Sequence, residues 1–589
     1  MKNHSTQQKK PPLLEKLTGA DAKKFGALPK IQLPGDNHLQ NQFNSHLAAC
    51  LQNHTLFRRS ILPVIPDDGR LVSMSPDHFV SWATHYCVPY RIRYDKDGDP
   101  VEVFKDMTQT HAKQALQSHE FIYSMPPIER IYPCPVPLID GNSFLTLATP
   151  GYNPATSTYV FNSALDQCYT PPDKSTMITS DGYYDDHLTL SDAVKHLYTV
   201  LKNFPFSDWD EYHTPTEDHP LYSTDPQGQP IPIRLSRSLA VQVGAMLSIF
   251  AANCIPQLAS RMGFIMNADQ QRSGKTLLVK IATIPVYGTF RAQSWRDDEE
   301  SMIKLIDAEV LAASPYICFD NVRSFVESPS IEGFMTTPTW TGRILGRSEM
   351  FNAENNTTIF ITGNNLNLGT DIKHRCLMID LHVPEADIQS RDIDNIIDDY
   401  WLADPTNRRN ILNALWAIVR HWDAAGRPTA MGRTRHGFDR WCKTIGGMVD
   451  LAGLGDMLAT PILENAGDTE AEDIIALVTI LYEINHHDYT HAEVIHHLWT
   501  NGLLTWSMSG REEYRPLREG SPETLTLHLD SKSQSKMGTL LQRHCHGERG
   551  AIHTLSINSI PVKVKFHSKG KGRHRRYFVT EIKKTITPK

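Results

Sequence analysis

The sequence predicts a multidomain protein of the α/β class. Its 589 residues are too many for one compact core, because single cores stop growing beyond about 300 residues. Four apolar runs between 263 and 381 each read as a strand that ends in, or follows directly on, a polar side chain, and helical patterns separate them. Such alternation of strand and helix indicates a parallel sheet. With 40% hydrophobic and 21% charged residues, the composition is that of a globular protein.

The chain is expected to divide into five parts. Composition and periodicity predict a flexible N-terminal segment (1–58), an α+β domain (59–232), an α/β core (233–390), a helical region (391–484) and a basic C-terminal domain (485–589). In the helical region one face carries Ile411, Leu412, Leu415, Ile418, Val419 and Trp422. The long apolar stretch 239–258 is interrupted by Gln242 and Asn253, so it predicts a buried helix and no membrane span.

Charge and cysteine usage narrow the class of protein. The net charge is −7, but residues 561–589 hold ten Lys/Arg against one Glu, which leaves −16 for the remainder. A polyanion is therefore expected to contact local basic patches. Nine cysteines stand singly without a CxxC pair, which argues against a zinc ribbon or a disulfide framework and suits a reducing cytoplasm. The paired histidines at 486–487 and 496–497 lack the partners of a metal site.

The clearest motif is GFIMNADQQRSGKTLLVKIATIP at 263–285, an apolar strand, a polar loop and an apolar helix that Pro285 is expected to end. In this context backbone N–H groups of Ser273 and Gly274 point at phosphate oxygens. Lys275 is expected to reach the β- and γ-phosphates of ATP, and the Thr276 hydroxyl to bind Mg²⁺. The usual first glycine of this motif is Asp269 here. The alternative is a chance SGKT at the start of a helix.

Three further strands carry polar residues at their ends. Asp320 ends the run PYICFDNV and is expected to bind Mg²⁺. Asn364 ends NNTTIFITGNN and is suited to orient water or sense the γ-phosphate, while Arg375 precedes CLMIDL and is suited to reach the nucleotide of a neighbouring subunit. The alternatives are ordinary turns and a surface arginine. We expect the strand ends near 268, 320 and 364 to meet, with the Lys275 ammonium, around one triphosphate.

The order of these motifs resembles that of the superfamily-three-type AAA+ helicases of phage and mobile-element primase-helicases. The run from NVRSFVESP to TGNNLNLGTDIKHRCLMIDL is particularly similar, and the resemblance covers about 120–455. It implies a P-loop AAA+ core, a homohexameric ring with ATP between subunits, and single-stranded DNA in a central channel. The implied roles are Walker A for Lys275 and Thr276, Walker B for Asp320, sensor 1 for Asn364 and arginine finger for Arg375. Residues 59–232 then read as an oligomerisation collar or a DNA-docking domain.

Two positions depart from the family pattern. Asn321 stands where many AAA+ enzymes have the glutamate that activates water, and an amide orients water without accepting its proton. Glu300 in RDDEESMIKLI is a candidate base, with a solvated charge run as the alternative. His374 occupies the first place of the expected basic pair.

Two segments are candidates for contact with nucleic acid. In TGRILGRSEMFNAENN, Arg343 and Arg347 are placed to contact phosphates and Phe351 to stack on a base, or the arginines pair with acids such as Glu349. The C-terminal stretch predicts two strands around a Gly-Lys-Gly turn and, with the helix before it, a winged-helix-like domain. Its wing would hold Lys569, Lys571, Arg573, Arg575 and Arg576 against phosphates, unless the stretch is a solvated tail.

Together these features predict an ATP-dependent DNA helicase or translocase that takes part in the replication of a phage, plasmid or integrated element. A P-loop ATPase acting as a DNA-bound regulatory or defence module is the first alternative. A DNA-binding scaffold with a decayed nucleotide site is the second, because of Asp269 and Asn321.

Overall fold

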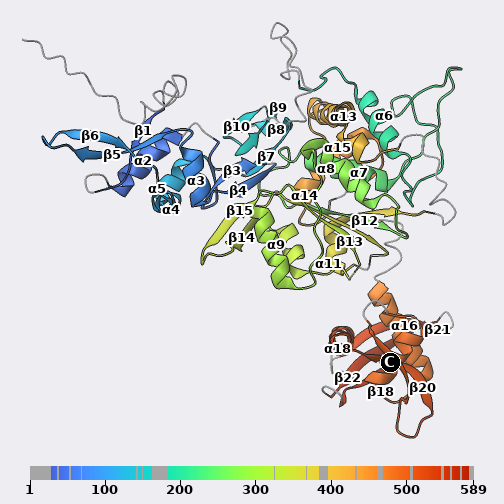
Figure 1. The fold of residues 1–589 in the computed structure, drawn as a ribbon. Coiled ribbons are helices and arrows are strands. Elements are labelled where there is room, and N and C mark those ends of the chain that lie inside the picture. Colours follow the sequence, from blue (N-terminus) through green and yellow to red (C-terminus); the bar gives the residue numbers. More distant parts are fainter. Residues whose placement is uncertain are drawn as a thin grey trace, which may run out of the picture. The chain divides into compact units, whose positions relative to one another are not determined.

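The chain forms two compact units in a computed structural model (Figure 1). The first contains Met1–Val322, Ser328–Asn365 and Lys373–Ala459, and the second contains Arg323–Glu327, Leu366–Ile372 and Thr460–Lys589. The structure describes residues 28–35, 39–51, 55–67, 69–140, 144–148, 150–161, 183–323, 325–366, 368–383, 396–430, 434–459, 469–504, 508–545, 550–557, 560–570 and 574–582.

The N-terminal part of the first unit mixes small sheets with short helices. Its elements are β1 (Lys30–Gln32), α2 (Gln40–Leu51), β2 (Phe57–Arg59), β3 (Leu62–Asp67), β4 (Arg70–Ser73), α3 (Pro76–Ala83), β5 (Val88–Tyr94), β6 (Pro100–Phe104), α4 (Gln109–Leu116), α5 (His119–Ser124), β7 (Arg130–Tyr132), β8 (Val136–Asp140), β9 (Phe144–Ala148), β10 (Gly151–Asn153) and β11 (Thr158–Val160). The sheets have the orders β1-β5-β6, β2-β3-β4, β10-β11-β7 and β8-β9.

In the second half of the N-terminal segment 1–58, which the sequence predicts to be flexible, the structure contains β1 and α2. β1 pairs in parallel with β5, and α2 buries Phe43 and Leu47 completely against α5 and the neighbouring helices. Three apolar side chains at helical spacing (Phe43, Leu47 and Leu51) form this buried face, although polar residues surround them in the sequence. Residues 1–27 lie outside the described residues.

The centre of the first unit is a parallel sheet with the order β13-β16-β12-β17. Its elements are α6 (Leu190–Leu201), α7 (Arg237–Phe250), β12 (Gly263–Ala268), α8 (Lys275–Tyr287), α9 (Glu299–Leu311), β13 (Tyr316–Val322), α10 (Pro329–Thr336), β14 (Thr339–Arg343), β15 (Met350–Glu354), β16 (Thr358–Asn364), α11 (Thr370–Arg375) and β17 (Cys376–Leu381). β14 and β15 form an antiparallel hairpin apart from this sheet. The predicted alternation of strands and helices is therefore present.

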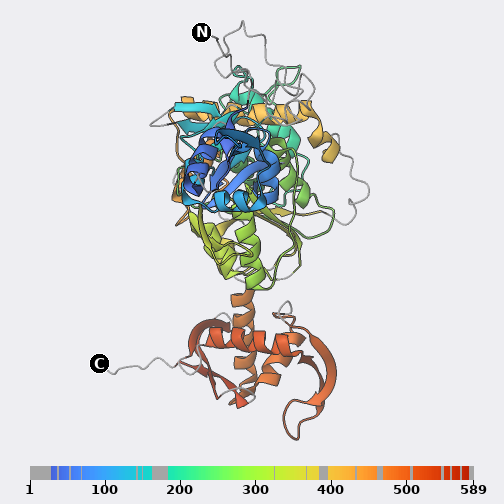
Figure 2. The same ribbon diagram turned by 60° about the vertical axis from the view of Figure 1, so that its left-hand side comes forward.

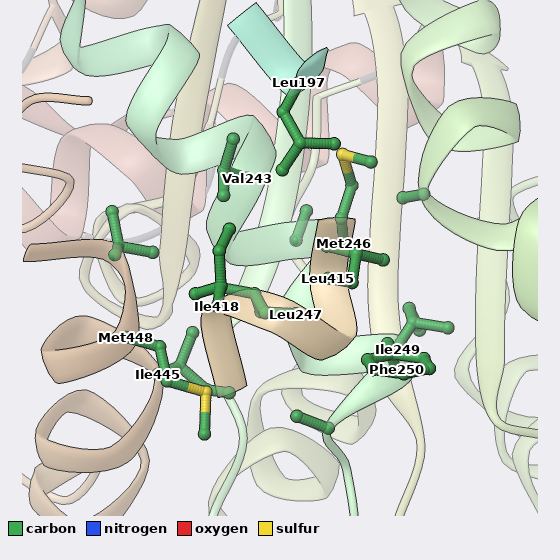
Figure 3. Packing of buried hydrophobic residues seen from close by; sticks show 14 of the residues in the cluster. Leu197, Val243, Met246, Leu247, Ile249, Phe250, Leu415, Ile418, Ile445 and Met448 are labelled. Carbon is green, nitrogen blue, oxygen red and sulfur yellow. The ribbon is translucent and has the colours of Figure 1, made fainter. Parts of the chain in front are cut away.

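The helical region predicted at 391–484 is divided: its part up to Ala452 packs on α7 and α8, whereas the helix Thr469–Ile484 belongs to the second unit. The first part consists of α12 (Asp399–Ala403), α13 (Pro405–Ala424), α14 (Asp439–Trp441), the π-helical turn η4 (Cys442–Gly446) and α15 (Gly447–Ala452). Figure 3 shows Leu415 and Ile418 of α13 beside Val243, Met246 and Leu247 of α7. The six apolar residues predicted to share a face of α13 are all buried. α13 begins where the Asp404 carboxylate caps the N–H groups of its first turn and Pro405 fixes its first residue.

Pro285 does not end α8, contrary to the sequence prediction. The helix continues to Tyr287 and stops at Gly288, which has a left-handed φ of 72°. The carbonyl of Pro285 accepts a bond from Nε of Arg408 at 2.7 Å, so α13 holds this last turn in place.

The second unit combines helices with a four-stranded antiparallel sheet (Figures 1 and 2). Its elements are α16 (Thr469–Ile484), β18 (Tyr489–Thr490), α17 (His491–Thr500), β19 (Gly510–Pro516), β20 (Glu523–Leu529), α18 (Ser531–Cys545), β21 (Ala551–Ile557), β22 (Ile560–Lys569) and β23 (Arg576–Glu581). The sheet has the order β18-β23-β22-β21, and β19-β20 is a separate hairpin inserted between α17 and α18. A capping box between Thr490 and Glu493 starts α17.

Among the described residues, no helix is long and apolar enough to cross a membrane. α7, the helix predicted from the apolar stretch 239–258, spans 14 residues and is buried within the first unit. The eight described cysteines are free thiols.

Candidate functional site

The strand ends that carry the polar motif residues meet at one edge of the parallel sheet. Ala268 at the end of β12 pairs with Asn364 at the end of β16 and with Leu381 at the end of β17. β13 lies on the far side of β16, and its register shifts between Phe319 and Val322. β16 therefore lies between β12, which leads into the loop before α8, and β13, which carries Asp320. The expectation that the ends near 268, 320 and 364 meet agrees with the structure.

The loop between β12 and α8 lacks the first glycine that this phosphate-binding motif usually has. Gly274 has φ 96°, and a Cβ on it would lie 3.0 Å from the Phe204 ring, so a glycine is required there. Asp269, in place of that first glycine, fastens the loop to the end of β17. One of its carboxylate oxygens accepts the N–H of Val383 at 3.3 Å, and the other lies 2.6 Å from Nδ1 of His382.

Lys275, at the start of α8, is held inside this loop. Its ammonium donates to the carbonyl of Gln270 at 3.0 Å, to Oγ of Ser273 at 2.9 Å and to Oδ1 of Asn364 at 2.6 Å. Burial lowers the pKa of Lys275, and the nearby Asp320 and Asp269 carboxylates oppose this. A buried cation with three neutral acceptors has unused capacity to attract an anion.

Asp320 is bound from two sides by hydroxyl groups. Its Oδ1 accepts from Oγ1 of Thr276 at 2.7 Å and from Oγ1 of Thr362 at 2.6 Å. The Thr362 hydroxyl in turn accepts the N–H of Asn321 at 2.9 Å and so supports the left-handed turn at Asn321, whose φ is 56°. Sequence reasoning missed Thr362. The signal was its place two residues before Asn364 on the same strand, which gives both side chains the same face.

The oxygen atoms at this edge suit magnesium. Mg²⁺ is usually bound through one or two carboxylates, with substrate phosphates and water completing its shell. Asp320 and the Thr276 hydroxyl provide such oxygens, 2.7 Å apart. Among the described residues no group of three or more His, Cys, Asp or Glu could hold a metal by itself. The donor set therefore fits an ion that also binds phosphate.

Arg375 lies at the opposite end of the sheet from Lys275. It precedes Cys376, which pairs with Gly263 at the start of β12, whereas the loop of Lys275 follows the end of that strand. Its guanidinium donates to the carbonyl of Glu332 and to Oγ1 of Thr336. Arg375 therefore does not join the nucleotide site of its own subunit.

Neither candidate for activating water is a buried base. Glu300 has a side chain that is 77% exposed and forms an i,i+4 ion pair with Lys304. The side chain of Asn321 is exposed as well. Glu299, the residue before Glu300, accepts hydrogen bonds from the backbone N–H and the hydroxyl of Ser330.

The hairpin β14–β15 carries Arg343 and Arg347 on its exposed end. Arg347 forms a long ion pair with Glu349 at 3.8 Å, as the sequence alternative proposed. The prediction that Phe351 stacks on a base is wrong, because Phe351 is 1% exposed. Strand alternation turns it toward α9, while Leu345 near the turn is 85% exposed.

Helix α9 anchors this hairpin through Asp307. The buried Asp307 carboxylate accepts from Nε1 of Trp340 at 2.7 Å and from the N–H of Arg343 at 2.9 Å. A Cβ on Gly342 would lie 2.1 Å from Oδ1 of Asp307, so glycine is required at this crossing. The Glu309 carboxylate on the same helix accepts a hydrogen bond from the guanidinium of Arg70 on β4 at 2.7 Å. It accepts another from the side-chain amide of Gln293, beside β13, at 2.9 Å.

In the second unit, β22 and β23 form the predicted antiparallel strands before and after the basic turn. Lys569 pairs with Arg576 across them, and its ammonium lies 5.9 Å from the Phe578 ring. Nε of Arg576 lies 3.6 Å from Asp488. Arg575 directly precedes β23, whereas Lys571 and Arg573 lie outside the described residues.

Comparison with known proteins identifies no family. No family model matches the chain, and no curated protein matches it. Among solved structures, it is similar to two A-form apo structures of the NrS-1 C-terminal region. The first has 11% identity and a TM-score of 0.24, and the match covers 53% of this chain and 80% of that chain. The second has 8% identity and a TM-score of 0.26, and the match covers 67% of this chain and 96% of that chain. It is also similar to JCV helicase with a bound phenylacetamide compound, with 11% identity, TM-score 0.21 and coverage of 40% of this chain and 65% of that chain. TM-scores this low support no conclusion about function.

Proposed function

We propose that the chain is an ATP hydrolase of the P-loop AAA+ class that works as a DNA helicase or translocase. The observation that carries the proposal is the meeting of Lys275, Thr276, Asp320 and Asn364 at the carboxyl edge of a parallel sheet. In open α/β sheets ligands bind at this edge, and a helix N-terminus there attracts phosphate.

Each side chain has a distinct task in this proposal. The loop N–H groups from Ser273 to Thr276 hold the phosphates, and Lys275 exchanges its bond to Gln270 for phosphate oxygens. Thr276 and Asp320 would hold Mg²⁺, which neutralises charge on the phosphate oxygens when bound. Asn364, already bonded to Lys275, orients the attacking water near the γ-phosphate.

Several features support action on DNA by an oligomer. Arg343 and Arg347 lie on an exposed hairpin, and the helix–strand order of α16, β18, α17, α18, β22 and β23 fits a winged helix in which β22 and β23, with Lys569 and Arg576, form the basic wing. In this proposal the wing contacts phosphates of the DNA backbone. Arg375 completes the site of a neighbouring subunit in a hexameric ring, because its own Lys275 lies at the other end of the sheet.

A second candidate is a DNA-bound ATPase switch that does not unwind, of a regulatory or defence kind. Asn321 favours it, because an exposed amide follows Asp320 where a proton-accepting carboxylate would speed hydrolysis. Slow hydrolysis suits a switch better than a motor.

Strand displacement separates the two candidates. Purified protein is incubated with a forked DNA duplex, ATP and Mg²⁺, alongside Lys275→Ala and the control Lys280→Ala, whose ammonium pairs with Asp399. We expect displacement by the wild type and the control and none by Lys275→Ala. Hydrolysis that depends on Lys275 without displacement would favour the switch, and equal hydrolysis by all three proteins would refute the nucleotide site.

A further inference from the structure

A groove in the first unit runs between the N-terminal sheet, helix α9 and the turn of the hairpin. Its volume is about 830 Å³, within the range of roughly 300–1,000 Å³ that ligand sites occupy. One wall consists of β3 and β4, the floor contains Asp307 and Leu311 of α9, and the other wall is 343–348. Figure 1 shows β4, β15 and α9 next to one another.

Hydrogen bonds fix the N-terminal wall against the core. The N–H of Leu71 donates to the carbonyl of Ala312 at 3.0 Å, and the N–H of Asn352 donates to Oγ of Ser60 at 3.1 Å. The guanidinium of Arg59, 2% exposed, donates to the carbonyls of Val310 and Glu354 at 3.0 and 3.3 Å. Because a buried arginine is costly to leave unpaired, this junction keeps one arrangement.

The rim of the groove is cationic. Four cations line it and only one acid does, and that acid, Asp307, is already bonded to the hairpin. The cations are Arg70, Lys304, Arg343 and Arg347. Lys304 and Arg347 pair with exposed acids, and such surface pairs are weak, whereas Arg70 pairs with the buried Glu309. Among the described residues, the guanidinium of Arg343 forms no ion pair.

The same groove exposes aliphatic surface. Leu345 is 85% exposed and Val72 is 37% exposed, and one lies on each wall. Unpaired bases present apolar faces that a duplex hides, so a single strand gains more from this surface than a duplex does. None of the residues that line the groove is aromatic, so the contact reads the backbone and not the base sequence.

We propose that this groove binds a single-stranded nucleic acid and that β3 and β4 form the wall facing the hairpin. The proposal rests on the proposed function and gives the N-terminal sheet a part in it. Phosphates contact the rim cations, while sugars and bases lie on Val72 and Leu345. The hairpin then moves a strand along a fixed wall, and does not hold it alone.

The test measures binding of the full-length protein to an oligothymidylate by fluorescence anisotropy. The variant combines Val72→Asp with Lys304→Glu, and the matched control combines Val101→Asp with Lys113→Glu, at exposed positions outside the groove. We expect the groove variant to bind at least about tenfold more weakly. The slope of log K against log salt should fall by about 0.7 for each phosphate that the variant no longer neutralises. ATP hydrolysis without DNA should match the wild type.

Photocrosslinking locates the strand directly. A benzophenone amino acid at position 72 should crosslink to the oligothymidylate, and one at position 101 should not. Unchanged binding and no crosslink at 72, with hydrolysis still dependent on Lys275, would overturn this inference and leave the proposed function standing. A groove variant that changes the oligomeric state, together with no crosslink from position 72, would make the groove a subunit contact and also overturn the inference. If the wild type showed no ATP hydrolysis that depends on Lys275, that result would instead refute the proposed function.

Discussion

The ammonium of Lys275 lies 2.6 Å from Oδ1 of Asn364, although 89 positions separate them in the chain. Lys275 begins the helix after β12, and Asn364 ends the strand beside it. The bond therefore reports that two motifs found separately in the sequence share one site. In the proposed function, this bond places Asn364 where it can respond when Lys275 binds phosphate.

Replacing Asn364 with alanine should impair catalysis more than nucleotide binding. The lysine keeps its bonds to Gln270 and Ser273, but the group next to the attacking water is lost. We expect kcat for ATP hydrolysis to fall by about 100-fold, the loss typical of one preorganised polar group, while the Kd of a fluorescent ATP analogue changes little. Asn352→Ala, at an exposed position on β15, is the control and should leave both constants unchanged.

Replacing Gly342 with alanine should disrupt the hairpin without touching the nucleotide site. The added Cβ would meet Oδ1 of Asp307 at 2.1 Å and the Phe351 ring at 2.6 Å. We expect the free energy of unfolding to fall by about 1–3 kcal/mol, as overpacking usually costs, with weaker binding of single-stranded DNA. Gly333→Ala is the control, because a Cβ there meets no atom within 4 Å. Equal stability of the two variants in urea titration would contradict the packing described.

The second unit should lose stability as the pH falls below 6.5. Burial lowers the pKa of His491, His497 and His567 from the ordinary value of 6.5. The unfolded chain then binds more protons than the folded one at acid pH, so stability is complete above 6.5 and declines below it. Hydrogen exchange of 469–582 in the full chain, measured between pH 8 and 5, should show this decline. His491→Gln should flatten it, and His528→Gln, at a half-exposed site, should not.

Mixing two inactive variants tests the role of Arg375. Because Arg375 lies at the other end of the sheet from its own Lys275, it acts across a subunit boundary if it acts on ATP at all. Arg375→Ala should lower hydrolysis by about 1,000-fold or more, as loss of an arginine finger does. Mixed with Lys275→Ala, it should recover activity, because some interfaces then contain both native residues. A mixture no more active than its components would show that Arg375 has no role in trans.

The sequence predicted the sheet better than the details around it. Apolar runs with a polar end are a local signal, and parallel strands bring such ends together, so Asp320 and Asn364 could be predicted as neighbours. Phe351 could not be placed, because the strand alternation of the hairpin has meaning only once α9 and Asp307 are known to lie beneath it. The residues of α2 look polar because its buried apolar side chains occur only at every fourth residue.

Contacts between distant segments were outside the reach of sequence reasoning. Glu309 and Asp307 lie in an ordinary charged helix, yet they connect β4, the edge beside β13 and the hairpin. Thr362 was missed for a related reason. Its hydroxyl matters only because β13 bulges to place Asp320 within 2.6 Å of it.

The most direct measurement is a structure of the full chain with Mg²⁺ and a slowly hydrolysed ATP analogue. We predict the triphosphate in the loop 269–275, with Nζ of Lys275 bonded to its β- and γ-phosphate oxygens and Mg²⁺ between Thr276 and Asp320. A nucleotide bound elsewhere, or a loop in which the Lys275 ammonium keeps its bond to Gln270 at saturating analogue, would contradict this site and the motor built on it.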